Sequence, residues 1–261
     1  TDTPYDEAGY MDIAPEDRGE NIRREICLML EQMGIRPESS HHEEGPGQNE
    51  IDFRYSDALT AADNAQTFET VVKTVSGRNG LWADFTPKPL KDKAGNGFHI
   101  NISANSEKGE VSLSHIIAGV LEFIPEMTAF LNPSEASYER FGQSKAPAYI
   151  SWSAENRSQL VRVPAAVYEQ KRVELRSPDP TANPYLAFAL LIYAGLYGIQ
   201  NNLTPPPASD INLFKADEET LSQFKKLPAS LDEAITVMKE STFIRKHLPE
   251  QIIELYSRKL I

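Results

Sequence analysis

Three short segments of the chain alternate strictly between apolar and polar residues, at 47–55, 98–103 and 172–176. Successive side chains of a strand point to opposite faces of its sheet. Each segment therefore predicts a strand with one apolar face on a core and one polar face open to water. The segments around them follow the longer period of helices. A chain that combines the two periods in this way is typical of an α+β domain.

Helical spacing of apolar residues predicts helices over 22–33, 68–77, 113–131, 185–199 and 243–260, with a further helix after residue 230. Asn183 and Pro184 have the pattern of an N-cap and a first-turn proline, and Ser230 with Glu233 has that of a capping box. Pro125 is expected to disturb the third helix. The 185–199 helix is so apolar that we expect it to be buried on most sides.

The length of 261 residues suffices for a substantial core, and we expect one domain over 1–261 with a helical C-terminal part from about residue 183. A net charge of −12 opposes contact with nucleic acid or an anionic membrane, since both favour a basic face. The most apolar stretch, 185–199, is too short to span a bilayer, and no secretory leader opens the chain. Cys27 is the single cysteine, so we expect a soluble protein of the reducing cytoplasm.

The polar strand faces, with the loop before the first strand, present a set of carboxylates and one imidazole: Glu43, Glu50, His99 and Glu174. Such an oxygen-rich set suits Mg²⁺ or Mn²⁺ better than a structural zinc ion. Ordinary solvated strand faces explain the same spacing, and the spacing alone leaves both readings open. The adjacent His41 and His42 are expected to point to opposite strand faces, so they do not ligate one ion together.

Residues 140–176 reverse the acidic balance of the chain. They hold seven cations and three acids, a local charge of 7 − 3 = +4: Arg140, Lys145, Arg157, Arg162, Lys171, Arg172 and Arg176 against Glu155, Glu169 and Glu174. Arginine presents a planar donor fork that suits phosphate and carboxylate, and arginines beside metal ligands favour phosphoryl transfer. A basic face for an acidic partner is the alternative. The chain has no P-loop and no Gly-x-Gly-x-x-Gly motif, so any nucleotide is held by another fold.

Several motifs resemble those of bacterial type I glutamine synthetase, in the family's order and over most of the chain. They are Ser-His-His-Glu at 40–43, Gly-Gln-Asn-Glu at 47–50, Phe-Thr-Pro-Lys-Pro at 85–89, Asn-Arg-Ser at 156–158, Arg-Val-Glu-Leu-Arg-Ser-Pro-Asp-Pro at 172–180 and Asn-Pro-Tyr-Leu at 183–186. The last two together are highly specific. The resemblance implies the carboxylate-amine ligase catalytic fold, a curved antiparallel sheet flanked by helices.

The resemblance also implies roles for individual residues. Glu43 and Glu50 resemble ligands of one divalent ion, and His99 and Glu174 resemble ligands of a second ion that bridges the ATP phosphates. Arg140, Arg157 and Arg176 correspond to catalytic residues. The implied binding residues are Arg157, Arg162 and Arg172 for phosphates, Ser103 for the nucleotide, and Gly95, Arg140 and Arg176 for the substrate.

In that family, ATP phosphorylates the γ-carboxylate of glutamate, and ammonia then attacks the acyl phosphate. The implied partners are therefore ATP, glutamate and ammonia, with no nucleic acid and no membrane. Family members form two stacked hexameric rings, which implies a homo-oligomeric dodecamer for the full-length parent. The family's N-terminal β-grasp domain and Glu-x-Glu strand have no counterpart in this sequence, so we expect the isolated chain to be inactive.

Four positions depart from the family pattern. Lys145 stands where the family has a flap glutamate that accepts the proton of ammonium, and Ala94 stands where an asparagine holds the substrate amino acid. Asn101 replaces a histidine near the phosphates, and Phe214 replaces the tyrosine that adenylylated members modify. Two alternatives to glutamine synthesis therefore stay open: a γ-glutamyl ligase for another amine, and a non-catalytic paralogue that still binds nucleotide.

Overall fold

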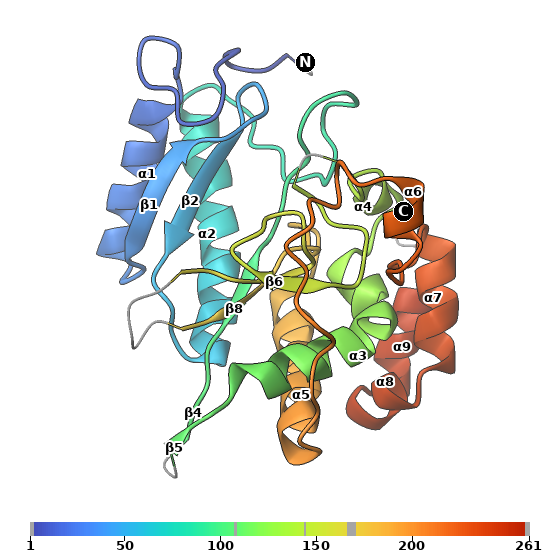
Figure 1. Ribbon diagram of the computed structural model, residues 1–261. Helices are drawn as coiled ribbons and strands as arrows, with labels where there is room; N and C mark the ends of the chain where they lie inside the picture. The colour runs from blue at the N-terminus through green and yellow to red at the C-terminus, as the bar shows by residue number, and fades with distance from the viewer. Residues whose placement is uncertain (1–2, 107–108, 144, 166–170, 259–261) are drawn as a thin grey trace. The chain divides into compact units, whose positions relative to one another are not determined.

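The computed structural model describes residues 3–106, 109–143, 145–165 and 171–258 (Figure 1). Contacts between residues cluster into two compact units. Unit 1 comprises Thr1–Phe85 and Pro89–Gly95, and unit 2 comprises Thr86–Lys88 and Asn96–Ile261. The single domain that the sequence predicts stays a prediction, because this clustering says nothing of whether either unit folds alone.

Unit 1 is an antiparallel hairpin that packs on two helices (Figure 1). The elements are α1 (Glu20–Gln32), β1 (Pro37–His42), β2 (Asn49–Phe53) and α2 (Ala58–Arg78). Ile51 and Phe53 of β2 pack on a buried cluster that includes Leu30 and Val75. The alternate residues of β2 therefore face away from this core, as the period of two predicts. Tyr55 lies beyond the end of the strand and is 77% exposed, so its predicted place on the apolar face is wrong.

The main sheet of unit 2 has four short strands in the order β3-β8-β7-β6. They are β3 (Ile100–Ile102), β6 (Trp152–Ala154), β7 (Val161–Val163) and β8 (Val173–Leu175), and β4 (Asn105–Ser106) forms a separate pair with β5 (Gly109–Glu110). The predicted α+β class is confirmed. The sheet is mixed, however, because β6 and β7 pair parallel while the other neighbours pair antiparallel.

The helices of unit 2 pack around a large apolar core. They are α3 (Leu113–Leu131), α4 (Glu135–Tyr138), α5 (Pro184–Gln200), α6 (Glu218–Leu221), α7 (Leu231–Glu240), α8 (Thr242–His247) and α9 (Glu250–Ser257). The predicted N-cap is confirmed, since the Asn183 side chain accepts hydrogen bonds from the backbone N–H groups of Tyr185 and Leu186. Ser230 likewise caps α7 by accepting from the Glu233 backbone N–H.

Two helix predictions need correction. The segment predicted as one helix over 243–260 forms α8 and α9, because Pro249 follows the end of α8 and begins the next helix as its N-cap. Helix α5 is not buried on most sides, since Ile192 and Leu196 are 41% and 44% exposed along one face.

Helix α3 is longer than the apolar stretch that the sequence singled out for a membrane test. Within the described residues it is the one helix whose length and mean hydropathy would suffice to cross a bilayer. Most of it is buried inside unit 2, including Ile124, Met127 and Phe130. This burial is typical of a core helix, whose apolar residues face other side chains.

Candidate functional site

Three of the predicted site residues in unit 2 meet around the carboxylate of Glu174, in the middle of β8. Its Oε1 accepts a hydrogen bond from Arg176 Nη1 at 2.8 Å, and its Oε2 lies 3.0 Å from Arg162 Nε on the neighbouring strand β7. The third neighbour is His99, whose Nδ1 lies 3.4 Å from Oε1. The structure thus brings His99 and Arg162 to the Glu174–Arg176 pair of β8 and the loop after it.

The predicted open face of β8 is wrong. All three residues of the strand are buried, and the Glu174 side chain is 9% exposed. The two arginines cover the carboxylate and supply the opposite charge that a buried carboxylate requires. Glu174 is therefore part of a buried ion-pair cluster.

His99 is held as a neutral imidazole in this cluster. Its pKa is lowered well below the usual value by burial first, and then by the positive charges of Arg176, Arg140, Arg162 and Lys145. A neutral ring nitrogen is the form of histidine that ligates a metal ion. Gly97 leaves room beside the ring, because a Cβ at that position would lie 3.0 Å from His99 Nε2.

Arg140 is fixed separately from Glu174, beside the loop that follows β8. Its Nη1 donates to the Ser177 carbonyl at 3.1 Å and lies 3.6 Å from Asp179 Oδ2. Asn132 also donates to Asp179 and to the Ser177 carbonyl, so the loop is held from two sides. The Arg140 guanidinium is 3% exposed, and burial lowers its pKa, which the charge of Asp179 partly offsets.

The remaining predicted residues of unit 2 lie towards its surface. Arg172 donates through Nε to the Asn101 side chain at 3.0 Å, so the residue that replaces a family histidine orients a predicted phosphate ligand. Arg157 accepts a hydrogen bond from Arg176 Nε through its backbone carbonyl, and its side chain is exposed. Ser103 lies in an exposed position just after β3. The structure places none of these three in the ion-pair cluster around Glu174.

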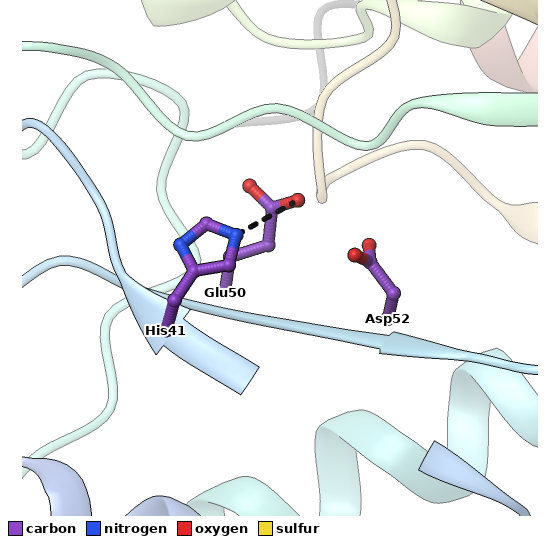
Figure 2. A group of neighbouring side chains, drawn as sticks. All are labelled: His41, Glu50 and Asp52. Carbon is purple, nitrogen blue, oxygen red and sulfur yellow. Dashed lines mark ion pairs between the residues drawn. The ribbon is translucent and has the colours of Figure 1, made fainter. Parts of the chain in front are cut away.

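A second cluster lies on the polar face of the unit 1 hairpin. Figure 2 shows His41 of β1 with Glu50 and Asp52 of β2 on this face, and His41 Nε2 lies 3.8 Å from Glu50 Oε1. One ligand atom from each of the three residues lies within 4.8 Å of the others. The carboxyl groups of Glu43 and Glu50 also interact through a hydrogen bond. The predicted pair Glu43 and Glu50 is therefore brought together, with two further polar residues beside it.

Crowding of acidic groups dominates the electrostatics of this cluster. The pKa of Glu50 is raised to about 8, first by burial and then by the charges and hydrogen bonds of Asp52 and Glu43. Several carboxylates around one point form a hard oxygen donor set, which fits a divalent cation such as Mg²⁺ or Mn²⁺. His41 and Asp52 were not among the predicted ligands. The signal for Asp52 was its place two residues after Glu50, on the same face of the strand.

The two adjacent histidines point to opposite faces, as predicted. His41 lies beside Glu50, whereas His42 is completely buried and contacts Asp6 through Nε2 at 2.9 Å.

The donor set around Glu174 also fits a cation. Glu174 Oε2 has no hydrogen-bond donor of acceptable geometry among the described residues, although it is buried. The 3.4 Å between His99 and Glu174 allows both to contact one ion, because such ligands lie about 2.0–2.1 Å from Mg²⁺. Each unit therefore holds one of the two predicted ligand pairs.

The raised pKa of Glu50 predicts a pH-dependent stability. Between pH 4.5 and 8 the folded chain keeps a proton on Glu50 that the unfolded chain has released, so stability falls as pH rises through this range. The variant Glu50→Gln lacks this titration. The melting temperatures of both proteins are measured with a chelator present. We expect the melting temperature of the variant minus that of the wild type to increase from pH 5 to pH 8 and to stay constant above pH 8. A difference that is the same at pH 5 and pH 8 would contradict the assignment.

Comparisons with known proteins agree on one family. A family model described as "Glutamine synthetase, catalytic domain" matches residues 1–259. A glutamine synthetase of Clostridium saccharobutylicum is 45% identical over 98% of this chain and 61% of its own length. One of Methanosarcina mazei is 43% identical over 96% of this chain and 60% of its own length. The chain thus spans about three-fifths of these relatives.

Solved structures show the same fold. The structure titled "GmaS/ADP complex-Conformation 1" matches 98% of this chain and 63% of its own, with a TM-score of 0.86 and 29% identity. A cryo-electron microscopy structure of Plasmodium falciparum glutamine synthetase matches 97% of this chain and 60% of its own, with a TM-score of 0.84 and 25% identity.

Proposed function

The chain belongs to the glutamine synthetase catalytic-domain family, and from this membership we propose that the whole protein is an ATP-dependent ligase. It joins ammonia to the γ-carboxylate of L-glutamate through γ-glutamyl phosphate. The observation that carries the proposal is the cluster in which Glu174 contacts His99, Arg162 and Arg176. A metal-ligand pair surrounded by arginines is suited to phosphoryl transfer, which depends on positioning and charge neutralisation.

Two divalent ions, Mg²⁺ or Mn²⁺, would neutralise phosphate charge: Glu43 and Glu50 would hold one, and His99 and Glu174 would hold the other. Arg162 and Arg176 both face the Glu174 carboxylate. Their donors are therefore aligned before substrate binds, and the two guanidinium groups would offer bidentate hydrogen bonds to the phosphoryl oxygens.

The other predicted residues complete the proposed site. Arg140 is buried and braced by the loop after β8, which suits a fixed contact to glutamate and the transferring phosphate. Arg157 and Arg172 reach towards solvent, where a nucleotide enters, and Ser103 contacts that nucleotide. Gly95 lies next to the substrate, and its carbonyl accepts a hydrogen bond from Gln48 Nε2.

Lys145 favours a second candidate, a γ-glutamyl ligase for an amine other than ammonia. Its charge is one of those that lower the pKa of His99, so it lies close to the predicted metal ligand. It also adopts a left-handed backbone conformation, with φ of 68°. A positive charge here repels ammonium but tolerates a neutral amine. The non-catalytic paralogue, which binds ATP without turnover, remains the third candidate.

Assembly and compartment are further parts of the proposal. We propose that the full-length parent is a cytoplasmic homo-oligomer, a dodecamer, without nucleic-acid or membrane partners. We propose that the 261 residues alone are inactive, because they span about three-fifths of the length of the relatives that they match.

The decisive measurement is phosphate release from ATP by the full-length parent with Mg²⁺ and glutamate. Ammonium is compared with hydroxylamine, an amine that is mostly neutral at pH 7, and Lys145→Glu is tested beside the wild type. Glutamine synthesis predicts release that depends on ammonium in the wild type. Release with hydroxylamine but not with ammonium would support the second candidate. If both proteins bind ATP but neither releases phosphate in an amine-dependent way, both ligase functions are contradicted and the paralogue is supported. Glutamine formation by the 261-residue chain would refute its predicted inactivity.

A further inference from the structure

A buried carboxylate near the start of the chain holds the turn that carries the predicted metal ligands of unit 1. Asp6 is 6% exposed. Its Oδ1 accepts hydrogen bonds from His42 Nε2 and from the Gly47 backbone N–H, both at 2.9 Å. Its Oδ2 accepts from the Arg18 backbone N–H at 3.0 Å. One side chain thus joins the N-terminal segment to both ends of the turn between β1 and β2.

His42, the last residue of β1, is the first of the two turn residues that Asp6 contacts. It is completely buried, and its Nδ1 lies 2.7 Å from the backbone carbonyl of Glu43. The imidazole therefore bridges Asp6 and the main chain of a predicted ligand. The His42 backbone carbonyl accepts a further hydrogen bond from the Met11 N–H. Rotation of this segment would break all of these contacts at once.

Gly47 is the second turn residue that Asp6 contacts, and its backbone conformation is constrained. Its φ is +63°, and a Cβ there would lie 3.1 Å from the Tyr5 backbone nitrogen. The turn is closed by the Glu43 N–H, which donates to the Gln48 carbonyl at 2.8 Å. Asp6 thereby fixes the main chain at His42, directly before Glu43, and at Gly47, three residues before Glu50.

From these contacts we propose that Asp6 is a positioning residue for the cation site of unit 1, acting through His42 and Gly47. The proposal rests on the proposed function for the identity of that site. The Asp6 side chain is 2% exposed, which is too deeply buried to bind an ion at the polar face of the hairpin. Its contribution is to hold the Glu43 carboxyl group next to Glu50 before a cation binds. Outer partners of metal ligands typically change metal affinity by about 10–100-fold when removed.

A role in stability alone is the competing explanation, because any buried hydrogen-bonded carboxylate stabilises the fold. The two explanations differ in what they predict for the folded protein. A stabilising group raises the melting temperature and leaves the cation affinity of the folded molecules unchanged. A positioning group changes that affinity, and it changes the local order of the turn.

The test compares Asp6→Asn with the wild-type chain. The amide keeps the size of the side chain but turns one acceptor oxygen into a donor, and both oxygens of Asp6 face N–H donors. Val75→Ala is the control, because Val75 is completely buried in the unit 1 core and lies in none of the Asp6 contacts. Mn²⁺ binding is followed by electron paramagnetic resonance, and Glu50→Gln identifies which bound ion belongs to unit 1. Hydrogen exchange of the 43–48 amides is measured without metal.

We expect Asp6→Asn to weaken binding of the unit 1 ion by about 10-fold or more and to speed exchange of the turn amides. Val75→Ala should lower the melting temperature and leave both readouts unchanged. Affinity within about twofold of the wild type, or unchanged turn exchange, would overturn the positioning role. If the wild type binds no Mn²⁺ that Glu50→Gln removes, the metal site of the proposed function fails, and the exchange result alone then decides whether Asp6 holds the turn.

Discussion

Replacing Gly119 with alanine is expected to lower the free energy of unfolding by about 4 kcal/mol or more, or to prevent folding. Helices α3 and α5 cross at Gly119 and Gly198, where the two backbones meet without side chains between them. A Cβ on Gly119 would overlap the backbone carbonyl of Ala194, and one on Gly198 would overlap that of His115. A backbone carbonyl has no rotamer to which it can move. The helices must therefore separate, which opens the core of unit 2.

Gly195, on the partner helix α5, provides the matched control. A Cβ at this position would lie 3.4 Å from a side-chain methyl of Ile116, which is ordinary contact. Alanine also has a higher helix propensity than glycine, by about 1 kcal/mol. We expect Gly195→Ala to change stability by less than about 1 kcal/mol in either direction. Urea denaturation followed by circular dichroism measures both variants, and equal stability of Gly119→Ala and Gly195→Ala would contradict the close crossing.

Replacing Glu174 with glutamine is expected to cost about 3–5 kcal/mol of folding free energy and to abolish cation binding in unit 2. The side chains of Arg176 and Glu174 are 3% and 9% exposed, so loss of the carboxylate removes the negative charge that two guanidinium groups face. The amide still accepts one hydrogen bond, but it does not neutralise charge. A buried unpaired charge is strongly destabilising.

Glu69→Gln is the control for this effect, because Glu69 pairs with Lys73 at the surface of α2, where the lysine side chain is 52% exposed. A surface pair of this kind contributes about 0–1 kcal/mol. Thermal and urea denaturation of the two variants should therefore differ clearly. If Glu174→Gln is as stable as Glu69→Gln, then the arginines find other partners in the folded protein, and the buried cluster is not the source of stability inferred from its geometry.

Sequence patterns predicted the helices and strands where the signal is local. The apolar stripe of α1, the N-cap of α5 and the alternation in β2 depend on neighbours within a few residues, and each is present in the structure. Sequence patterns gave wrong predictions where a segment packs on another that is distant in the sequence. The apolar run of α5 suggested burial on most sides, yet which face the core covers depends on the crossing with α3.

The candidate site divides in the same way. Motif resemblance predicted two pairs of metal ligands, Glu43 with Glu50 and His99 with Glu174. The structure brings the two members of each pair together. The resemblance did not identify His41 and Asp52, which join Glu50 only because the β1–β2 register places His41 opposite Glu50. The open face predicted for β8 failed because the arginines that cover Glu174 come from a neighbouring strand and from its own end.

The sequence by itself determined the family, the α+β class and the residue types of the site, because these depend on composition, period and motif. Only the tertiary structure decided that Glu174 is buried among arginines, that Asp6 reaches His42 and Gly47, and that α3 and α5 touch at two glycines. The contacting residues are separated by 2 positions, for Glu174 and Arg176, to 83 positions, for His115 and Gly198. Side-chain burial and charge pairing arise from that geometry, and no local pattern of residues encodes it.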